Sequence, residues 1–153
     1  MDNAISTLVG EDLEGCHKWC GNVAGVNGSI YGIPSGAHRV AKFNPLDKSI
    51  AHIGPDFGDE DGKWIRGAMT ENGVIYCPPC DEDSGILKID TNTDNVTELD
   101  ANLLPEDGGC VMWASCAAAP DGCIYFMPYS AIWIMKLDPN NNDAMTCVGD
   151  DLG

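Results

Sequence analysis

Asn27-Gly28-Ser29-Ile30-Tyr31-Gly32-Ile33-Pro34 is the first of three stretches that follow one pattern. The other two are Asn72-Gly73-Val74-Ile75-Tyr76-Cys77-Pro78-Pro79 and Asp121-Gly122-Cys123-Ile124-Tyr125-Phe126-Met127-Pro128. Asn-Gly and Asp-Gly favour the positive φ angles that two-residue hairpin turns require. Proline cannot donate to a sheet ladder, so it ends each run. Each stretch therefore predicts a tight turn followed by a short strand.

Two further landmarks keep the same register as these stretches. A tryptophan precedes each one, and a lysine-bearing apolar run follows it, at 40–45, 86–91 and 134–139. The tryptophans are Trp19, Trp64 and Trp113. Because several landmarks recur together, we interpret the chain as three copies of one unit of about 45 residues.

Each unit is predicted to contain four short strands. The first strands are expected at 19–25, 64–70 and 113–119, and the fourth strands end at Ile53, Leu99 and Val148. No 3.6-residue periodicity is present, and Gly and Pro interrupt the chain about every ten residues, which favours an all-β fold. We divide the chain into an N-terminal outer strand or tail (1–15) and three units (16–62, 63–108 and 109–153).

The Trp, the Asn/Asp-Gly-x-Ile-Tyr run and the Ile-x-Lys run together resemble the blade repeat of β-propeller proteins of the broad WD40, Kelch and NHL type. They are similar to repeats common in uncharacterised proteins of algae and other protists. The resemblance implies three four-stranded antiparallel blades. It implies no particular activity, because propellers host binding, scaffolding and catalysis alike.

Three blades are too few for a closed ring, since propellers typically have four to eight. An open array would expose two apolar blade faces. We therefore expect two chains to associate head to tail into a six-bladed ring, that is, a homodimer. The alternative is that the chain is a piece of a longer repeat protein.

The composition narrows the classes of partner. The 153 residues include 24 Asp and Glu but only 8 Lys and Arg, for a net charge of −16. Because such an acidic surface repels phosphate backbones, we expect no nucleic-acid partner. There is no apolar run of about 18 residues, so we expect no membrane span. The first residues lack the pattern of a signal peptide, and the compartment stays open.

Candidate ligand-binding residues lie mainly in the loops that differ between copies, because binding residues favour loops on a rigid frame. The three tryptophans form either an aromatic ring at a channel mouth, suited to cations or sugars, or blade-to-blade packing. Arg66 stands among small residues of an inner strand, where it binds an anion or pairs with a carboxylate. The full set of candidates is Trp19, Trp64, Trp113, Arg66, His38, Arg39, Tyr129 and Trp133.

The sequence contains no recognisable catalytic motif, and we predict neither a cofactor nor a metal site. Cys77-Pro78-Pro79-Cys80 is a single C-x-x-C, whereas structural zinc usually needs two such pairs. The acidic clusters around 56–61 and 81–83 are interpreted as solvated charge, with a patch for a basic partner or weak binding of a divalent cation as the alternative. The favoured function is a non-catalytic binding or scaffold module for a protein or small ligand. The alternatives are a lectin-like oligomer, and a propeller hydrolase or lyase with a channel-mouth site.

Overall fold

The computed structural model describes residues 7–9, 13, 16–81, 83–100 and 113–149. These residues form three four-stranded antiparallel sheets and no helix. We call the sheets blades 1, 2 and 3 in chain order. The all-β prediction with three four-stranded blades is confirmed. Within the described ranges no helical segment could cross a bilayer.

Each blade is built from consecutive strands paired with their neighbours in the chain. Blade 1 contains β1 (Trp19–Ala24), β2 (Ile30–Pro34), β3 (Val40–Phe43) and β4 (Ile50–Ile53). Blade 2 contains β5 (Ala68–Met69), β6 (Val74–Cys77), β7 (Ile86–Asp90) and β8 (Asn95–Leu99). Blade 3 contains β9 (Trp113–Ala118), β10 (Ile124–Pro128), β11 (Ile134–Asp138) and β12 (Ala144–Val148).

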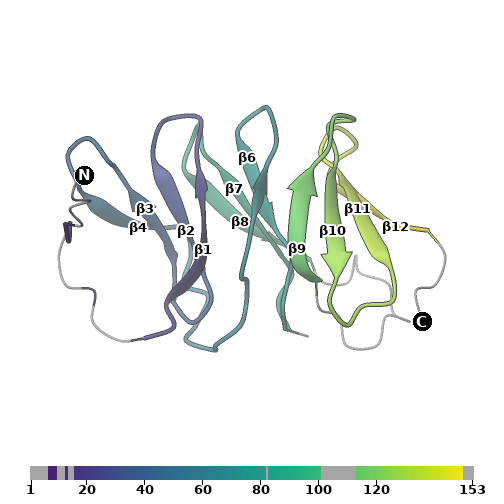
Figure 1. The fold of residues 1–153 in the computed structure, drawn as a ribbon, viewed down its shortest axis with the longest axis horizontal. Coiled ribbons are helices and arrows are strands. Elements are labelled where there is room, and N and C mark those ends of the chain that lie inside the picture. The colour runs from purple at the N-terminus through teal and green to yellow at the C-terminus, as the bar shows by residue number, and fades with distance from the viewer. Residues whose placement is uncertain (1–6, 10–12, 14–15, 82, 101–112, 150–153) are drawn as a thin grey trace, which may run out of the picture.

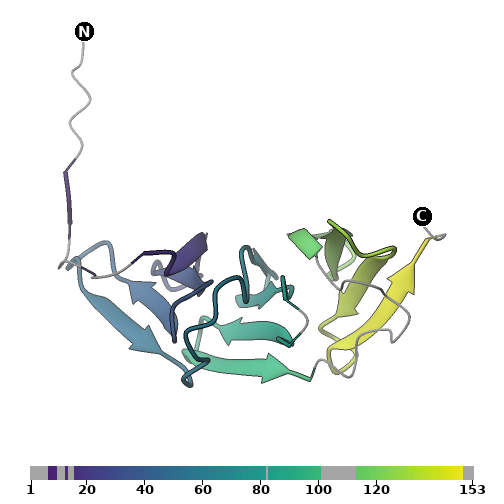
Figure 2. The same cartoon turned by 90° about the horizontal axis from the view of Figure 1, so that it is seen from below.

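The blades stand side by side in a curved row (Figures 1 and 2). The first strand of each blade lies on the concave side of the row, and the fourth strand lies on the convex side (Figure 2). The predicted hairpin turns are present, with φ angles of 80°, 82° and 81° at Gly28, Gly73 and Gly122. These turns lie along one edge of the row, which we call the turn edge. The β2–β3, β6–β7 and β10–β11 connections lie along the other, which we call the loop edge (Figure 1).

The first strand of blade 2 is shorter than the predicted 64–70. Only Ala68–Met69 pairs continuously with β6, and Trp64 makes an isolated bridge to Pro79. The intervening backbone lies against blade 1, because a Cβ atom placed on Gly21 would come within 2.3 Å of the Ile65 carbonyl oxygen. A contact with the neighbouring blade therefore replaces part of the expected ladder.

The predicted N-terminal outer strand falls mostly outside the described residues. Residues 7–9 and 13, which are described, belong to no strand of the three blades. The described strands fall inside the three predicted units, whose outer limits stay predictions.

The hydrophobic core lies between the blades rather than within one of them. One cluster joins blades 1 and 2, and its members include Tyr31, Ile33 and Trp64. The second cluster joins blades 2 and 3 and includes Tyr76 and Phe126. Successive strand residues point to opposite faces, so each middle strand supplies side chains to both neighbours. The stability of each blade therefore depends on the blade beside it.

Candidate functional site

A hollow of about 600 Å³ on the loop edge is lined by residues of blade 2 and of the segment that joins blades 1 and 2. That segment follows β4, and the β6–β7 connection supplies the opposite wall. The lining residues are Asp56, Phe57, Glu60, Asp61, Lys63, Trp64, Asp81, Asp83, Ser84 and Glu98. Six of these ten residues are acidic and one is basic, so the hollow is strongly negative. We call it the acidic pocket.

The base of the acidic pocket is held by packing and by backbone hydrogen bonds. The Phe57 ring meets the Trp64 ring edge-on, with 5.0 Å between centroids. The Phe57 amide donates to the His38 carbonyl at 2.8 Å, which ties the segment to blade 1. Lys63 is buried, and its ammonium donates to the carbonyl oxygens of Gly58 and Glu60 at 3.0 and 2.7 Å. The one lysine of the pocket therefore holds backbone oxygens and neutralises none of the carboxylates directly.

Several of the carboxylates are occupied by groups of the protein. Asp81 accepts hydrogen bonds from the backbone amides of Asp83 and Ser84, at 3.2 and 2.7 Å, and so shapes its own loop. Glu98 accepts from the Gly85 amide at 2.5 Å. The carboxylates of Glu60 and Asp83, by contrast, have no hydrogen-bond or ion-pair partner among the residues that the structure describes. These two groups are available to a cation.

Asp56 joins the acidic pocket to the predicted site residue His38. The Gly58 amide donates to the Asp56 carboxylate at 2.9 Å, and His38 Nδ1 lies 2.8 Å from the same oxygen. These hydrogen bonds, first that of Gly58 and then that of His38, hold the pKa of Asp56 below its usual value. Asp56 is therefore ionised at neutral pH.

The tryptophans do not surround a channel mouth as one set. Trp64 and Trp113 are only 1% and 3% exposed and lie within the core clusters between blades. Each indole N–H donates within its own blade, Trp19 to the Arg39 carbonyl, Trp64 to Gly85 and Trp113 to Trp133. Their burial agrees with the packing interpretation and leaves Trp64 and Trp113 inaccessible to a ligand.

Three predicted residues, Trp19, His38 and Arg39, come together in a second hollow of about 370 Å³. It lies on blade 1, where Trp19 also stacks at 5.6 Å from the His52 ring. Trp19 occupies the position of the buried Trp64 and Trp113. This hollow therefore belongs to the face of blade 1 that adjoins no other blade among the described residues.

The other predicted residues lie apart from these. Arg66 lines a hollow of about 280 Å³ with Cys20, Gly21 and Asn22 on the inner strands, and it makes no ion pair with any described carboxylate. Tyr129, 76% exposed, and Trp133 lie in the β10–β11 connection of blade 3. The eight candidates are thus distributed over several places rather than gathered into one site.

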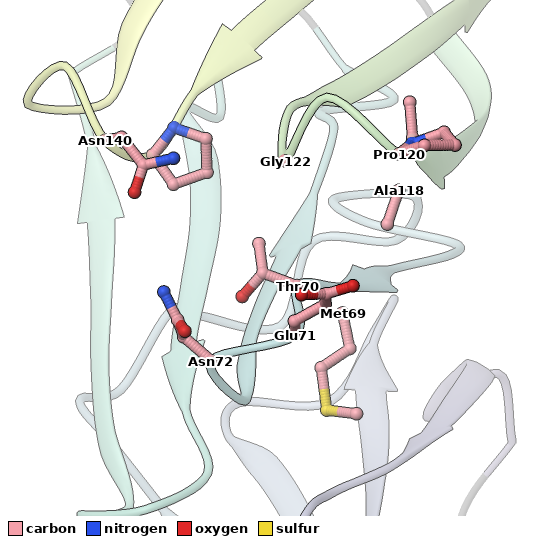
Figure 3. Close-up of a pocket in the computed structure, with 10 residues that line it drawn as sticks. Met69, Thr70, Glu71, Asn72, Ala118, Pro120, Gly122 and Asn140 are labelled. Atoms are coloured by element: carbon pink, nitrogen blue, oxygen red, sulfur yellow. The ribbon is translucent and has the colours of Figure 1, made fainter.

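The turn edge carries a hollow of about 400 Å³ between blades 2 and 3 (Figure 3). Its polar side chains are Thr70, Glu71, Asn72 and Asn140, from the turns of the two blades (Figure 3). With one carboxylate, it is far less charged than the acidic pocket.

The described residues contain neither a metal-binding cluster nor a reactive cysteine. No group of three or more His, Cys, Asp or Glu side chains is placed to hold a metal ion in those ranges. The described cysteines are all free thiols, and burial raises the pKa of Cys80 to about 11 and that of Cys116 to about 12. Such thiols stay protonated and weakly nucleophilic at neutral pH.

The sequence shows the acidic residues of 56–61 and 81–83 as two clusters, interpreted above as solvated charge, and does not join them into one pocket. Residues 56–61 and 81–83 were separate loops in the sequence, and Phe57 and Lys63 carried no signal of their own. The available signal was the repeat register, which puts the two loops on the same edge of adjacent blades.

Comparisons with known proteins identify the fold. The chain matches virginiamycin B lyase from Staphylococcus aureus with a TM-score of 0.66 and 14% identity, over 84% of this chain and 40% of that one. A streptogramin B lyase matches with a TM-score of 0.65, 17% identity, and 84% and 39% of the two chains. A putative gluconolactonase matches with a TM-score of 0.63, 10% identity, and 87% and 49% of the two chains. This chain has a β-propeller-like fold.

The same comparisons identify the fold but no family and no activity. No protein-family model matches the chain, and no curated protein matches it. The chain spans less than half the length of these three solved structures. At identities of 10–17% the likeness carries the arrangement of the blades and not the chemistry of the sites.

Proposed function

We propose that this chain is a non-catalytic binding module that presents its loop edge to a protein segment carrying cationic side chains. The observation that carries the proposal is the acidic pocket, in which Glu60 and Asp83 have no partner among the described residues. A cationic side chain entering the pocket gains charge-assisted hydrogen bonds without breaking any that the described residues make. The net charge of −16 adds long-range attraction for such a partner.

A tetralysine peptide tests this proposal by calorimetric titration at low salt. Replacing Glu60→Gln and Asp83→Asn together should weaken peptide binding by roughly tenfold, because the two available carboxylates are lost. The matched control is Asp47→Asn with Glu71→Gln, which removes the same charge outside the acidic pocket. Equal weakening in both double variants would show general charge attraction and would contradict a site in the pocket.

We also propose that a second copy completes the ring. This proposal is supported by the comparison with the putative gluconolactonase, because the three blades match 49% of that chain. The unmatched part is long enough for three further blades. Binding in the acidic pocket does not depend on this closure, because one chain supplies all the residues that line the pocket.

The two alternative functions receive less support. A lectin-like ring would need all three tryptophans at the surface, but Trp64 and Trp113 are buried in the core. A lyase or hydrolase activity is suggested only by the names of structures that share the fold at low identity.

A further inference from the structure

A tyrosine and a lysine form a cross-strand pair in every blade. Tyr31 lies opposite Lys42, Tyr76 opposite Lys88, and Tyr125 opposite Lys136. In each pair the ammonium stands over the tyrosine ring, at 5.9, 5.5 and 5.8 Å from the centroid. The pair therefore presents a hydroxyl and an ammonium to the blade that follows.

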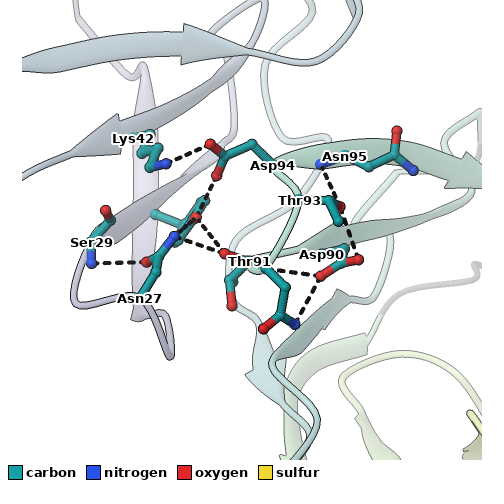
Figure 4. A network of polar contacts seen from close by, with 10 residues as sticks. Asn27, Ser29, Lys42, Asp90, Thr91, Thr93, Asp94 and Asn95 are labelled. Atoms are coloured by element: carbon teal, nitrogen blue, oxygen red, sulfur yellow. Dashed lines mark hydrogen bonds and ion pairs between the residues drawn. The ribbon is translucent and has the colours of Figure 1, made fainter.

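At both internal interfaces an aspartate of the following blade accepts from both groups. The Tyr31 hydroxyl donates to Asp94 at 2.7 Å, and the Lys42 ammonium lies 2.5 Å from the same carboxylate (Figure 4). The Tyr76 hydroxyl donates to Asp143 at 2.6 Å, and Lys88 pairs with that aspartate too. We call this arrangement the interblade clasp.

Between blades 1 and 2 an asparagine completes the clasp on the side of the preceding blade. The Asn27 amide donates to the Tyr31 hydroxyl at 2.8 Å and to the Thr91 carbonyl at 2.7 Å. Asn27 and Asp94 therefore contact the same hydroxyl from opposite sides of the interface. The two positions therefore meet across the boundary between blades 1 and 2.

Two faces adjoin no other blade among the described residues, and we call them the open faces: that of blade 1 before β1 in chain order, and that of blade 3 after β12. Each open face carries a charged residue that departs from the internal pattern. In blade 1 the position of Asp94 and Asp143 is held by Lys48, with the same left-handed backbone (φ 62°, against 60° and 57°). In blade 3 the position of Asn27 and Asn72 is held by Asp121. The Asp121 carboxylate accepts from the Tyr125 hydroxyl at 2.8 Å and lies 3.3 Å from the Lys136 ammonium.

These departures make each open face unsuited to an ordinary blade. A following blade with aspartate at the clasp position would place a second carboxylate beside Asp121. A preceding blade with the usual tyrosine and lysine but with asparagine at the turn would place its lysine beside Lys48, with no carboxylate between them. Like charges brought together at an interface are unfavourable and exclude the wrong partner. Asp121 and Lys48, by contrast, have opposite charges at positions that meet.

We infer that the open face of blade 3 docks onto the open face of blade 1 in a second copy, with Lys48 of the second copy paired to Asp121. The inference rests on the ring closure proposed above and identifies the residues that select a second copy. In the dimer each Asp121 carboxylate lies between Lys136 of its own chain and Lys48 of the other. The same docking applies to both boundaries, so the two-fold ring closes.

The apolar residues of the two open faces agree with such docking. Met127 is 46% exposed, whereas Ile33 at the same position of blade 1 is buried against blade 2. Trp19 is likewise partly exposed, whereas Trp64 and Trp113 are buried. Docking covers these side chains as the internal interfaces cover their equivalents.

The test is the solution mass of four proteins measured by sedimentation: the original chain, Lys48→Asp, Asp121→Asn, and the double variant. We expect the original chain to sediment at twice its 16.3 kDa. Each single variant should dimerise roughly tenfold more weakly, because it sets two like charges together. The double variant recreates the internal clasp, with Asn and Asp at its two positions, and should regain most of the dimer.

The substitutions are tolerated by the fold, because Asp94 and Asn27 already occupy these positions in the same chain. Asp59→Asn, a loop-edge carboxylate, controls for a change in net charge and should leave dimerisation unchanged. A monomeric original chain would overturn the inference, as would a double variant no better than the single ones. Peptide binding to the acidic pocket is measured separately, so a failure of ring closure is distinguishable from a failure of the proposed function.

Discussion

Tyr31 and Tyr125 occupy the same position in blades 1 and 3, and their surroundings differ. Tyr31 is fully buried against blade 2, and this burial is the main reason that its pKa rises to about 12. Tyr125 is partly exposed, and its pKa rises mainly because its hydroxyl donates to Asp121 of the same blade. The pKa of the tyrosine is thus raised in both blades, mainly by burial against a neighbouring blade for Tyr31 and mainly by a hydrogen bond within its own blade for Tyr125. The comparison separates the interactions that a blade makes within itself from those that require a neighbouring blade.

The tryptophans should show the largest difference between an internal interface and an open face. Trp64→Ala leaves a cavity between blades 1 and 2 and should lower the free energy of unfolding by about 3–5 kcal/mol. Trp19→Ala, the matched variant on the open face, should cost clearly less under monomeric conditions. Urea denaturation at low protein concentration measures both. Equal losses would mean that the interface adds nothing to the burial of this side chain.

A smaller difference is expected at the clasp. Asp143→Asn suits the left-handed backbone but weakens the contacts with Tyr76 and Lys88, so it should lower the free energy of unfolding by about 1–3 kcal/mol. Asp121→Asn, at the exposed end, should change the stability of the monomer less. Thermal and urea unfolding of the two variants tests the ordering, and a larger effect at Asp121 would contradict it.

The smallest effect is a dependence on pH. Burial opposes the charge of Asp94, but the hydrogen bonds from Lys42 and Tyr31 prevail and hold its pKa below its usual value. A depressed pKa stabilises the folded state fully above the unfolded pKa, and the stabilisation is lost as the pH falls through the folded pKa. The urea midpoint should therefore fall more steeply below about pH 4 in the original chain than in Asp94→Asn. If the urea midpoints of the two proteins fell in parallel with pH, protonation of Asp94 would not be coupled to unfolding.

Much of the fold could be predicted because it depends on local chemistry. Asn-Gly and Asp-Gly fix the hairpins through the positive φ of one glycine, and the period-two pattern of the strands follows from the pleat. The short β5 strand could not be predicted, because the Ile65 carbonyl approaches Gly21 of another blade. The site was predicted only in part. His38 lies beside the acidic pocket through Asp56, whereas Phe57 and Lys63 acquire their roles only when two distant loops meet.

The amino-acid sequence by itself determined the repeat, the all-β class and the number of blades, since these follow from turn residues and spacing along the chain. Only the tertiary structure decided which tryptophans are buried, which carboxylates are free and which residues meet across a blade boundary. The physical reason is that burial and pairing depend on the neighbouring blade, about 45 residues away in the chain, while turns and strands depend on the residues beside them.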